Sequence, residues 1–216
     1  MARTLRIDAY FDLICPWCWI GKSLLLQARE RLAASDPEAR IEVYWYSVQL
    51  IADVPEEGWP YVAFYERRLG STLAVRAHQA QVLEAASRAG GVTIDFAHIV
   101  TVPNTWQAHR LLAQAAPQLA PAAFEALLQR LFEAYFQRGE NLGDADTLAR
   151  IARQHSVDLA AEPGQPIPEV WGPQGGVSGV PFFVFNRRRA LSGAQPVEVL
   201  LAAMQQGARD TESAAS

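Results

Sequence analysis

The chain contains only two cysteines, Cys15 and Cys18, and they stand three positions apart. A pair at this spacing forms either a redox-active dithiol or half of a zinc site. A zinc site needs two more ligands, and no two of the histidines lie at ligand spacing. The histidines are His78, His98, His109 and His155. We therefore interpret the cysteines as a redox pair and predict no metal site; a structural disulfide and two inert buried thiols are the alternatives.

The pair lies where a strand pattern gives way to a helical one. Apolar and polar residues alternate over residues 4–11, and apolar residues then recur at helical spacing over residues 19–34. Free N–H groups and the positive dipole end of the helix favour a thiolate at Cys15, which is the reactive form of cysteine. We expect Cys15 to be the exposed attacking thiol, with the lower pKa. Cys18, one turn further in, is then the shielded resolving thiol.

Three neighbours complete the candidate site around the pair. Pro16 suits the first position of a helix, because its missing N–H is not needed there. Trp17 offers either an apolar surface to an unfolded substrate or a packing contact with other helices. Asp12 is either a turn or capping residue, which we favour, or a carboxylate close to the thiols.

The remaining pattern predicts one α/β domain interrupted by a helical insertion. Strands are expected at 41–50, at 177–186 and again just after the basic turn 187–189, before a last helix that begins near Pro196 and stops at Gly207. Between them the pattern predicts helices at 61–69, 72–88, 105–115, 122–138 and 145–155. We expect residues 1–58 and 160–216 to form the α/β domain and residues 59–159 to form the inserted one.

Composition excludes several classes of function. The chain has 216 residues, 50% of them hydrophobic, with a net charge of −4, so neither a disordered chain nor a nucleic-acid partner is expected. No apolar run is long enough for a membrane helix. Asp8 and Asp12 interrupt any secretory signal. We therefore expect a cytoplasmic protein with no membrane partner.

Two further groups of residues could serve the site. Pro181 follows Val180 and precedes an apolar strand, and the residues alone favour a cis and a trans bond equally. Asn104 could cap the helix that carries Trp106 and His109. These two side chains either face the cysteine pair across a cleft or pack within the helical block.

Four blocks, in this order over nearly the whole chain, resemble the DsbA family of the thioredoxin superfamily, and most closely its FrnE-like branch. They are FDLICPWCWIGK (11–22), NTWQAHRL (104–111), LFEAYFQRGENLGD (131–144) and GVSGVPFFVFNRRRALSGAQP (176–196). The resemblance implies a thioredoxin fold, a central mixed sheet flanked by helices, with a large all-helical insertion. It also implies that Val180–Pro181 is a cis-proline loop facing the cysteines. Arg188 departs from the glycine common in that turn, and we expect this to affect only the hairpin.

The resemblance favours a thiol–disulfide oxidoreductase or isomerase acting on protein or small-molecule disulfides. Cys15, Cys18 and Pro181 are its catalytic residues, and Pro16, Trp17, Val180, Trp106 and His109 its substrate-binding residues. No cofactor is expected, with glutathione as a possible reductant. One alternative is a glutathione-dependent enzyme of the kappa-class transferase or 2-hydroxychromene-2-carboxylate isomerase type, which generally has a serine at the first cysteine position. Another is a holdase-like binding module, which needs neither cysteine.

Overall fold

The computed structural model describes residues 3–160 and 179–213 of the chain. Two compact units form: Met1–Val48 with Gly172–Ser216, and Gln49–Trp171. The first boundary thus falls after Val48, whereas the sequence pattern placed it after residue 58. Asn104 explains the difference, because its side chain donates to the Val54 carbonyl (2.6 Å) and accepts from the Gln49 amide (2.8 Å). These hydrogen bonds tie the segment after Val48 to the helical unit.

The first unit is built on a four-stranded mixed sheet in the order β2-β1-β5-β6. Its strands are β1 (Arg3–Phe11), β2 (Ala39–Ser47), β5 (Phe182–Phe185) and β6 (Arg189–Ser192). β1 pairs in parallel with β2, whereas β1 with β5 and β5 with β6 are antiparallel. The parallel pair requires a long crossover, and helix α1 (Pro16–Ser35) supplies it. The predicted α/β thioredoxin-like fold with a mixed sheet and an inserted helical region is confirmed.

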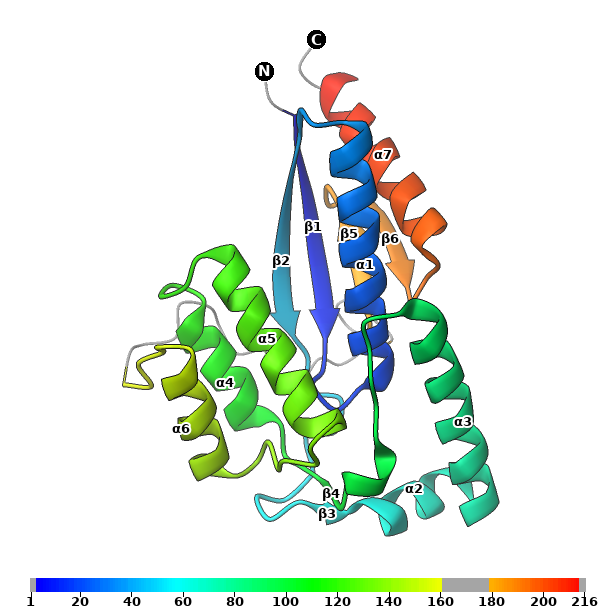
Figure 1. The fold of residues 1–216 in the computed structure, drawn as a ribbon, viewed down its shortest axis with the longest axis vertical. Helices are drawn as coiled ribbons and strands as arrows, with labels where there is room; N and C mark the ends of the chain where they lie inside the picture. Colours follow the sequence, from blue (N-terminus) through cyan, green and yellow to red (C-terminus); the bar gives the residue numbers. More distant parts are fainter. Residues whose placement is uncertain (1–2, 161–178, 214–216) are drawn as a thin grey trace. The chain divides into compact units, whose positions relative to one another are not determined.

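Helices α1 and α7 (Val197–Ser213) lie side by side on one face of this sheet (Figure 1). The core-facing residues of β1, Leu5, Ile7 and Ala9, are fully buried. Gly207 lies inside α7, so the prediction that the helix stops there is wrong. A Cβ atom on Gly207 would come within 2.7 Å of Leu5 Cδ1. The glycine therefore serves close packing of α7 on β1 and not helix termination.

The turn between β5 and β6 depends on Asn186. Its side chain accepts a hydrogen bond from the Arg6 backbone N–H (2.9 Å) and donates one to the Gly207 carbonyl (2.7 Å). Asn186 and Arg187 both have left-handed backbones, with φ of 49° and 56°. Asparagine tolerates this conformation, so the strained position is Arg187, one residue before the Arg188 that departs from the family's common glycine.

Up to residue 160, the regular structure of the second unit is helical apart from two short strands, β3 (Trp59–Pro60) and β4 (Thr101–Val102), with one short 3₁₀ turn, Phe96–His98. Its helices are α2 (Tyr61–Leu69), α3 (Thr72–Ala89), α4 (Trp106–Ala115), α5 (Pro121–Phe136) and α6 (Ala145–Gln154). They form close to their predicted bounds. The two-residue strands carry no periodic signal, and the sequence analysis did not predict them. No helix in residues 3–160 or 179–213 has the length and hydropathy that crossing a membrane requires.

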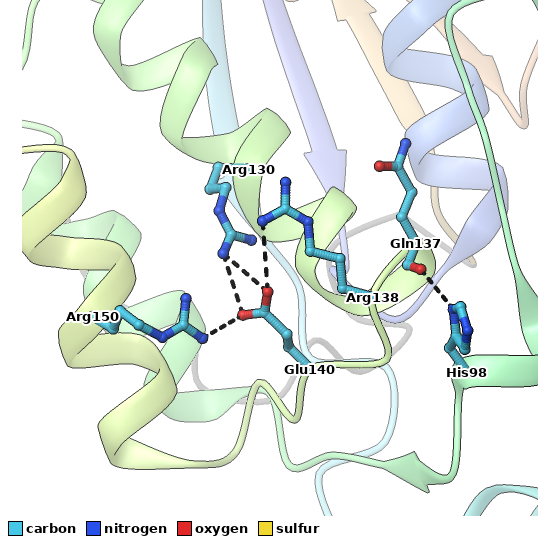
Figure 2. Close-up of polar contacts among 6 residues, drawn as sticks. All are labelled: His98, Arg130, Gln137, Arg138, Glu140 and Arg150. Atoms are coloured by element: carbon cyan, nitrogen blue, oxygen red, sulfur yellow. Dashed lines mark hydrogen bonds and ion pairs between the residues drawn. The ribbon is translucent and has the colours of Figure 1, made fainter.

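Glu140, in the loop after α5, joins this loop to α5 and α6 (Figure 2). Its carboxylate accepts hydrogen bonds from Arg130 (3.0 and 3.3 Å) and Arg150 (2.7 Å), and Arg138 lies 3.9 Å away. Burial raises the pKa of Glu140, but hydrogen bonds and charge from Arg150 and Arg130 outweigh it and lower the pKa overall. The ionised carboxylate therefore stabilises this corner of the helical unit.

Candidate active site

The start of α1 positions both cysteines. Cys15 is the N-cap residue, with an extended backbone (φ −90°, ψ 110°), and Pro16 is the first helical residue, as predicted. A turn precedes the helix, and in this turn the Cys15 N–H donates to the Asp12 carbonyl (3.2 Å). The Cys18 N–H then donates to the Cys15 carbonyl (3.0 Å). These contacts hold the two thiols within one turn of each other at the positive end of the helix dipole.

Both cysteines are free thiols, and both are buried. Cys15 is 8% exposed and Cys18 is 2% exposed. The expectation of an exposed Cys15 is therefore wrong, although it remains the more accessible of the two. Part of the reason is the Val180 carbonyl, which accepts a hydrogen bond from Cys15 Sγ at 3.6 Å.

The environment of Cys18 keeps it protonated. Burial, followed by the hydrogen bond and charge of Cys15, raises the pKa of the Cys18 thiol well above its ordinary value. The Asp12 backbone partly opposes this rise, whereas the Asp12 carboxylate adds to it. Asp12, which is fully buried, therefore serves both as the turn residue that we favoured and as a carboxylate close to the thiols.

The Val180–Pro181 segment meets α1 at Gly21. The Val180–Pro181 peptide bond is cis, which is the isomer that the family resemblance implied. A Cβ atom on Gly21 would lie 2.9 Å from Pro181 Cγ and 3.3 Å from Phe183 Cζ. Such contacts are too close for a well-packed interior, so glycine at this position allows Pro181 to approach the helix.

No role was predicted for Gly21 from the sequence. A glycine inside a helix costs about 1 kcal/mol relative to alanine, so its presence usually has a packing reason. Gly21 follows Cys18 by three residues, inside a clear helical pattern. That position was the available signal, but its partner Pro181 is 160 residues further along the chain (181 − 21) and could not be inferred from it.

The other residues predicted for substrate binding divide between the two units. In the first unit Pro16 is buried, and Trp17 and Val180 are half-buried. In the second unit Trp106, the first residue of α4, is 40% exposed, and His109 is only 1% exposed. Their predicted position opposite the cysteine pair stays a prediction.

Asn104 acts at the start of α4 much as expected. Thr105 is the N-cap residue, but the side chain that accepts a hydrogen bond from the Trp106 N–H (2.9 Å) is that of Asn104. Within the described residues, no group of three or more His, Cys, Asp or Glu side chains could hold a metal ion.

Comparison with known proteins identifies the family of the chain. The profile of the DSBA-like thioredoxin domain matches residues 6–162. The crystal structure of the probable DsbA oxidoreductase SCO1869 from Streptomyces coelicolor is 26% identical, with a TM-score of 0.79 over 94% of this chain and 89% of that chain. The uncharacterized protein YwbO of Bacillus subtilis is 24% identical over 158 residues, which are 73% of this chain and 70% of YwbO.

A more distant structure shares the fold alone. It is the cytosolic disulfide reductase DsbM from Pseudomonas aeruginosa with GSH, which is 14% identical, with a TM-score of 0.52 over 96% of this chain and 98% of that chain. The extent of the profile match decides the assignment, because it covers most of the chain and includes Cys15 and Cys18. The chain belongs to the family of DSBA-like thioredoxin domains.

Proposed function

We propose that the chain is a thiol–disulfide oxidoreductase or isomerase in which Cys15 attacks and Cys18 resolves. The Cys15 thiolate attacks one sulfur of a substrate disulfide, forming a mixed disulfide and releasing the other substrate sulfur as a thiol after protonation. Cys18 then loses its proton and attacks Cys15 Sγ, which releases the second substrate thiol. Two electrons pass to the substrate, and the Cys15–Cys18 disulfide forms. The same steps in reverse oxidise a dithiol.

The observation that carries this proposal is the placement of the two thiols at the start of α1. Cys15 is the N-cap residue, and Cys18 is in hydrogen-bond contact with it. The Val180 carbonyl lies 3.6 Å from Cys15 Sγ. A substrate segment that pairs with the Val180 backbone, as an added strand does, would therefore bring its own sulfur to Cys15.

The substrates that we propose are proteins or small molecules carrying a disulfide or a dithiol, in the cytoplasm. The FrnE-like branch remains the proposed place of the chain within its family. Glutathione is the proposed reductant that regenerates the dithiol. The structure of DsbM with GSH makes glutathione a reasonable first reagent, although the likeness to DsbM is one of fold.

Turnover of a disulfide-bonded peptide with glutathione as reductant tests the proposal. We expect the wild-type chain to accelerate the reaction and Cys15→Ser to abolish the acceleration. Cys18→Ser should accumulate a mixed disulfide on Cys15. A glutathione-conjugating activity that survives Cys18→Ser, with no disulfide turnover, would support the isomerase or transferase alternative. Suppression of aggregation that survives replacement of both cysteines, again without turnover, would support the holdase alternative.

A further inference from the structure

The helical unit contains a cavity to which, apart from Trp106, no role in the proposed function is assigned. Its volume is about 500 Å³, and all the residues that line it belong to the unit Gln49–Trp171. Small-molecule sites commonly have volumes of about 300–1,000 Å³, so the cavity is large enough for a ligand with one or two rings.

One side of the cavity is apolar. Leu111 and Leu148 line it from α4 and α6 and are nearly fully buried, and Leu159 lies beyond the end of α6. Trp106 adds its indole ring, which is 40% exposed. An exposed indole beside buried leucines offers a flat apolar surface on which an aromatic ring can stack.

Arg110, one turn after Trp106 on α4, contributes a positive charge to the lining of the cavity. Its guanidinium carbon lies 5.8 Å from the centre of the Trp106 ring. Over residues 3–160 and 179–213, Arg110 forms no ion pair, so its charge is not neutralised by the chain that the structure describes. A guanidinium held beside an indole keeps its N–H groups available for bidentate binding of a carboxylate.

The remaining polar wall is compatible with an anion. Glu56 is the one acidic side chain among the described lining residues, and it is exposed at the surface. Gln107 lines the cavity with its neutral amide, and Ala145 places the first turn of α6 there. Asp144 caps this first turn and Asp146 lies within it, so the positive charge available to an anion is that of Arg110.

We propose that this cavity binds a small aromatic carboxylate. The ring lies against Trp106 and the leucines, and the carboxylate accepts hydrogen bonds from Arg110. The ligand needs both a flat apolar ring and one negative charge, because Trp106 and Arg110 lie one helical turn apart and would contact the same molecule. All the lining residues belong to the unit Gln49–Trp171, and the occupancy that we propose requires neither cysteine.

Calorimetric titration of the full chain with 2-naphthoate tests this inference. We expect saturable binding of one molecule per chain, and binding at least about tenfold weaker for the neutral analogue 2-naphthalenemethanol, since hydrogen bonds to charged groups are the strong ones. Arg110→Gln should weaken 2-naphthoate binding by a similar factor, and Arg110→Lys by less. The control Arg76→Gln, an exposed arginine on α3, should bind as the wild type does.

The outcomes separate this proposal from the proposed function. The double variant Cys15→Ser, Cys18→Ser should bind 2-naphthoate like the wild type, whether or not the wild type turns over disulfides. Absence of saturable binding, or equal binding by Arg110→Gln, would overturn the inference. If Arg110→Gln does not fold, Trp106→Leu provides the second test, and undiminished binding by that variant has the same consequence.

Discussion

Gly21 leaves no room for a Cβ atom beside Pro181, and replacing it with alanine tests how Pro181 is held. The added Cβ would lie 2.9 Å from Pro181 Cγ and 3.3 Å from both Pro181 Cβ and Phe183 Cζ. The Pro181 ring is stiff, and the Pro181 carbonyl also accepts a hydrogen bond from the Gly193 N–H (2.8 Å). We therefore expect the segment that carries Val180 to shift away from α1.

Two opposing terms set the effect of Gly21→Ala on stability. Alanine in place of a helical glycine stabilises by about 1 kcal/mol, whereas overpacking a full interior costs about 1–3 kcal/mol. The expected net change is a loss of about 0–2 kcal/mol in the free energy of unfolding, measured by urea titration. Because Val180 O lies 3.6 Å from Cys15 Sγ, disulfide turnover should fall as well.

Gly207→Ala is the matched control, since it also adds a methyl group inside a helix. Its Cβ would meet Leu5 Cδ1 at 2.7 Å, on the part of the sheet that carries no site residue. We expect this variant to lose stability and to keep its turnover when folded. A Gly21→Ala protein that gains about 1 kcal/mol and turns over disulfides normally would refute the argument for Gly21.

Variants of Cys18, Glu140 and Asn104, with Arg138→Gln as a control, give three further tests. The raised pKa of Cys18 means that above about pH 8.5 the folded reduced chain retains a proton that the unfolded chain has lost. Its free energy of unfolding should fall by up to about 1.4 kcal/mol per pH unit there, and Cys18→Ala should remove this slope. Glu140→Gln should lower the free energy of unfolding, measured by urea titration, by about 1–3 kcal/mol, because it leaves Arg130 buried without its carboxylate. The control Arg138→Gln, at a half-exposed residue, should change that free energy by less than about 0.5 kcal/mol. Since the pKa of Glu140 is lowered, its contribution is present at neutral pH and should be lost as the pH falls below about 4.5. Asn104→Ala should lower the thermal midpoint and reduce the free energy of unfolding by about 1–3 kcal/mol, because three hydrogen bonds are lost. An unchanged midpoint would contradict the role of Asn104 in tying the segment after Val48 to the helical unit.

The elements with a clear period were predictable from the sequence. The strand, helix, strand order of β1, α1 and β2 follows from alternation and helical spacing, and the parallel pairing follows from the length of the connection. The end of α7 was not predictable, because Gly207 lies inside the helix. There it leaves room for Leu5, a residue near the other end of the chain. The boundary after Val48 depends in the same way on the distant hydrogen bonds of Asn104.

The site was predictable where local geometry decides it. The spacing of Cys15 and Cys18 and the place of Pro16 at the helix start follow from neighbouring residues alone. The burial of Cys15 depends on Val180, and the closeness of Pro181 depends on Gly21. These contacts join segments far apart in the chain, so they appear only in the folded structure.

The most direct test of the central claim is to identify the cysteine that captures a disulfide. Reduced Cys18→Ser and Cys15→Ser variants are treated briefly with glutathione disulfide at neutral pH, and each adduct is located by peptide mass spectrometry. The account predicts a rapid glutathione adduct on Cys15 in Cys18→Ser and a much slower one on Cys18 in Cys15→Ser, because the buried Cys18 remains a protonated thiol. Faster capture by Cys18 than by Cys15, or no adduct on either, would contradict it.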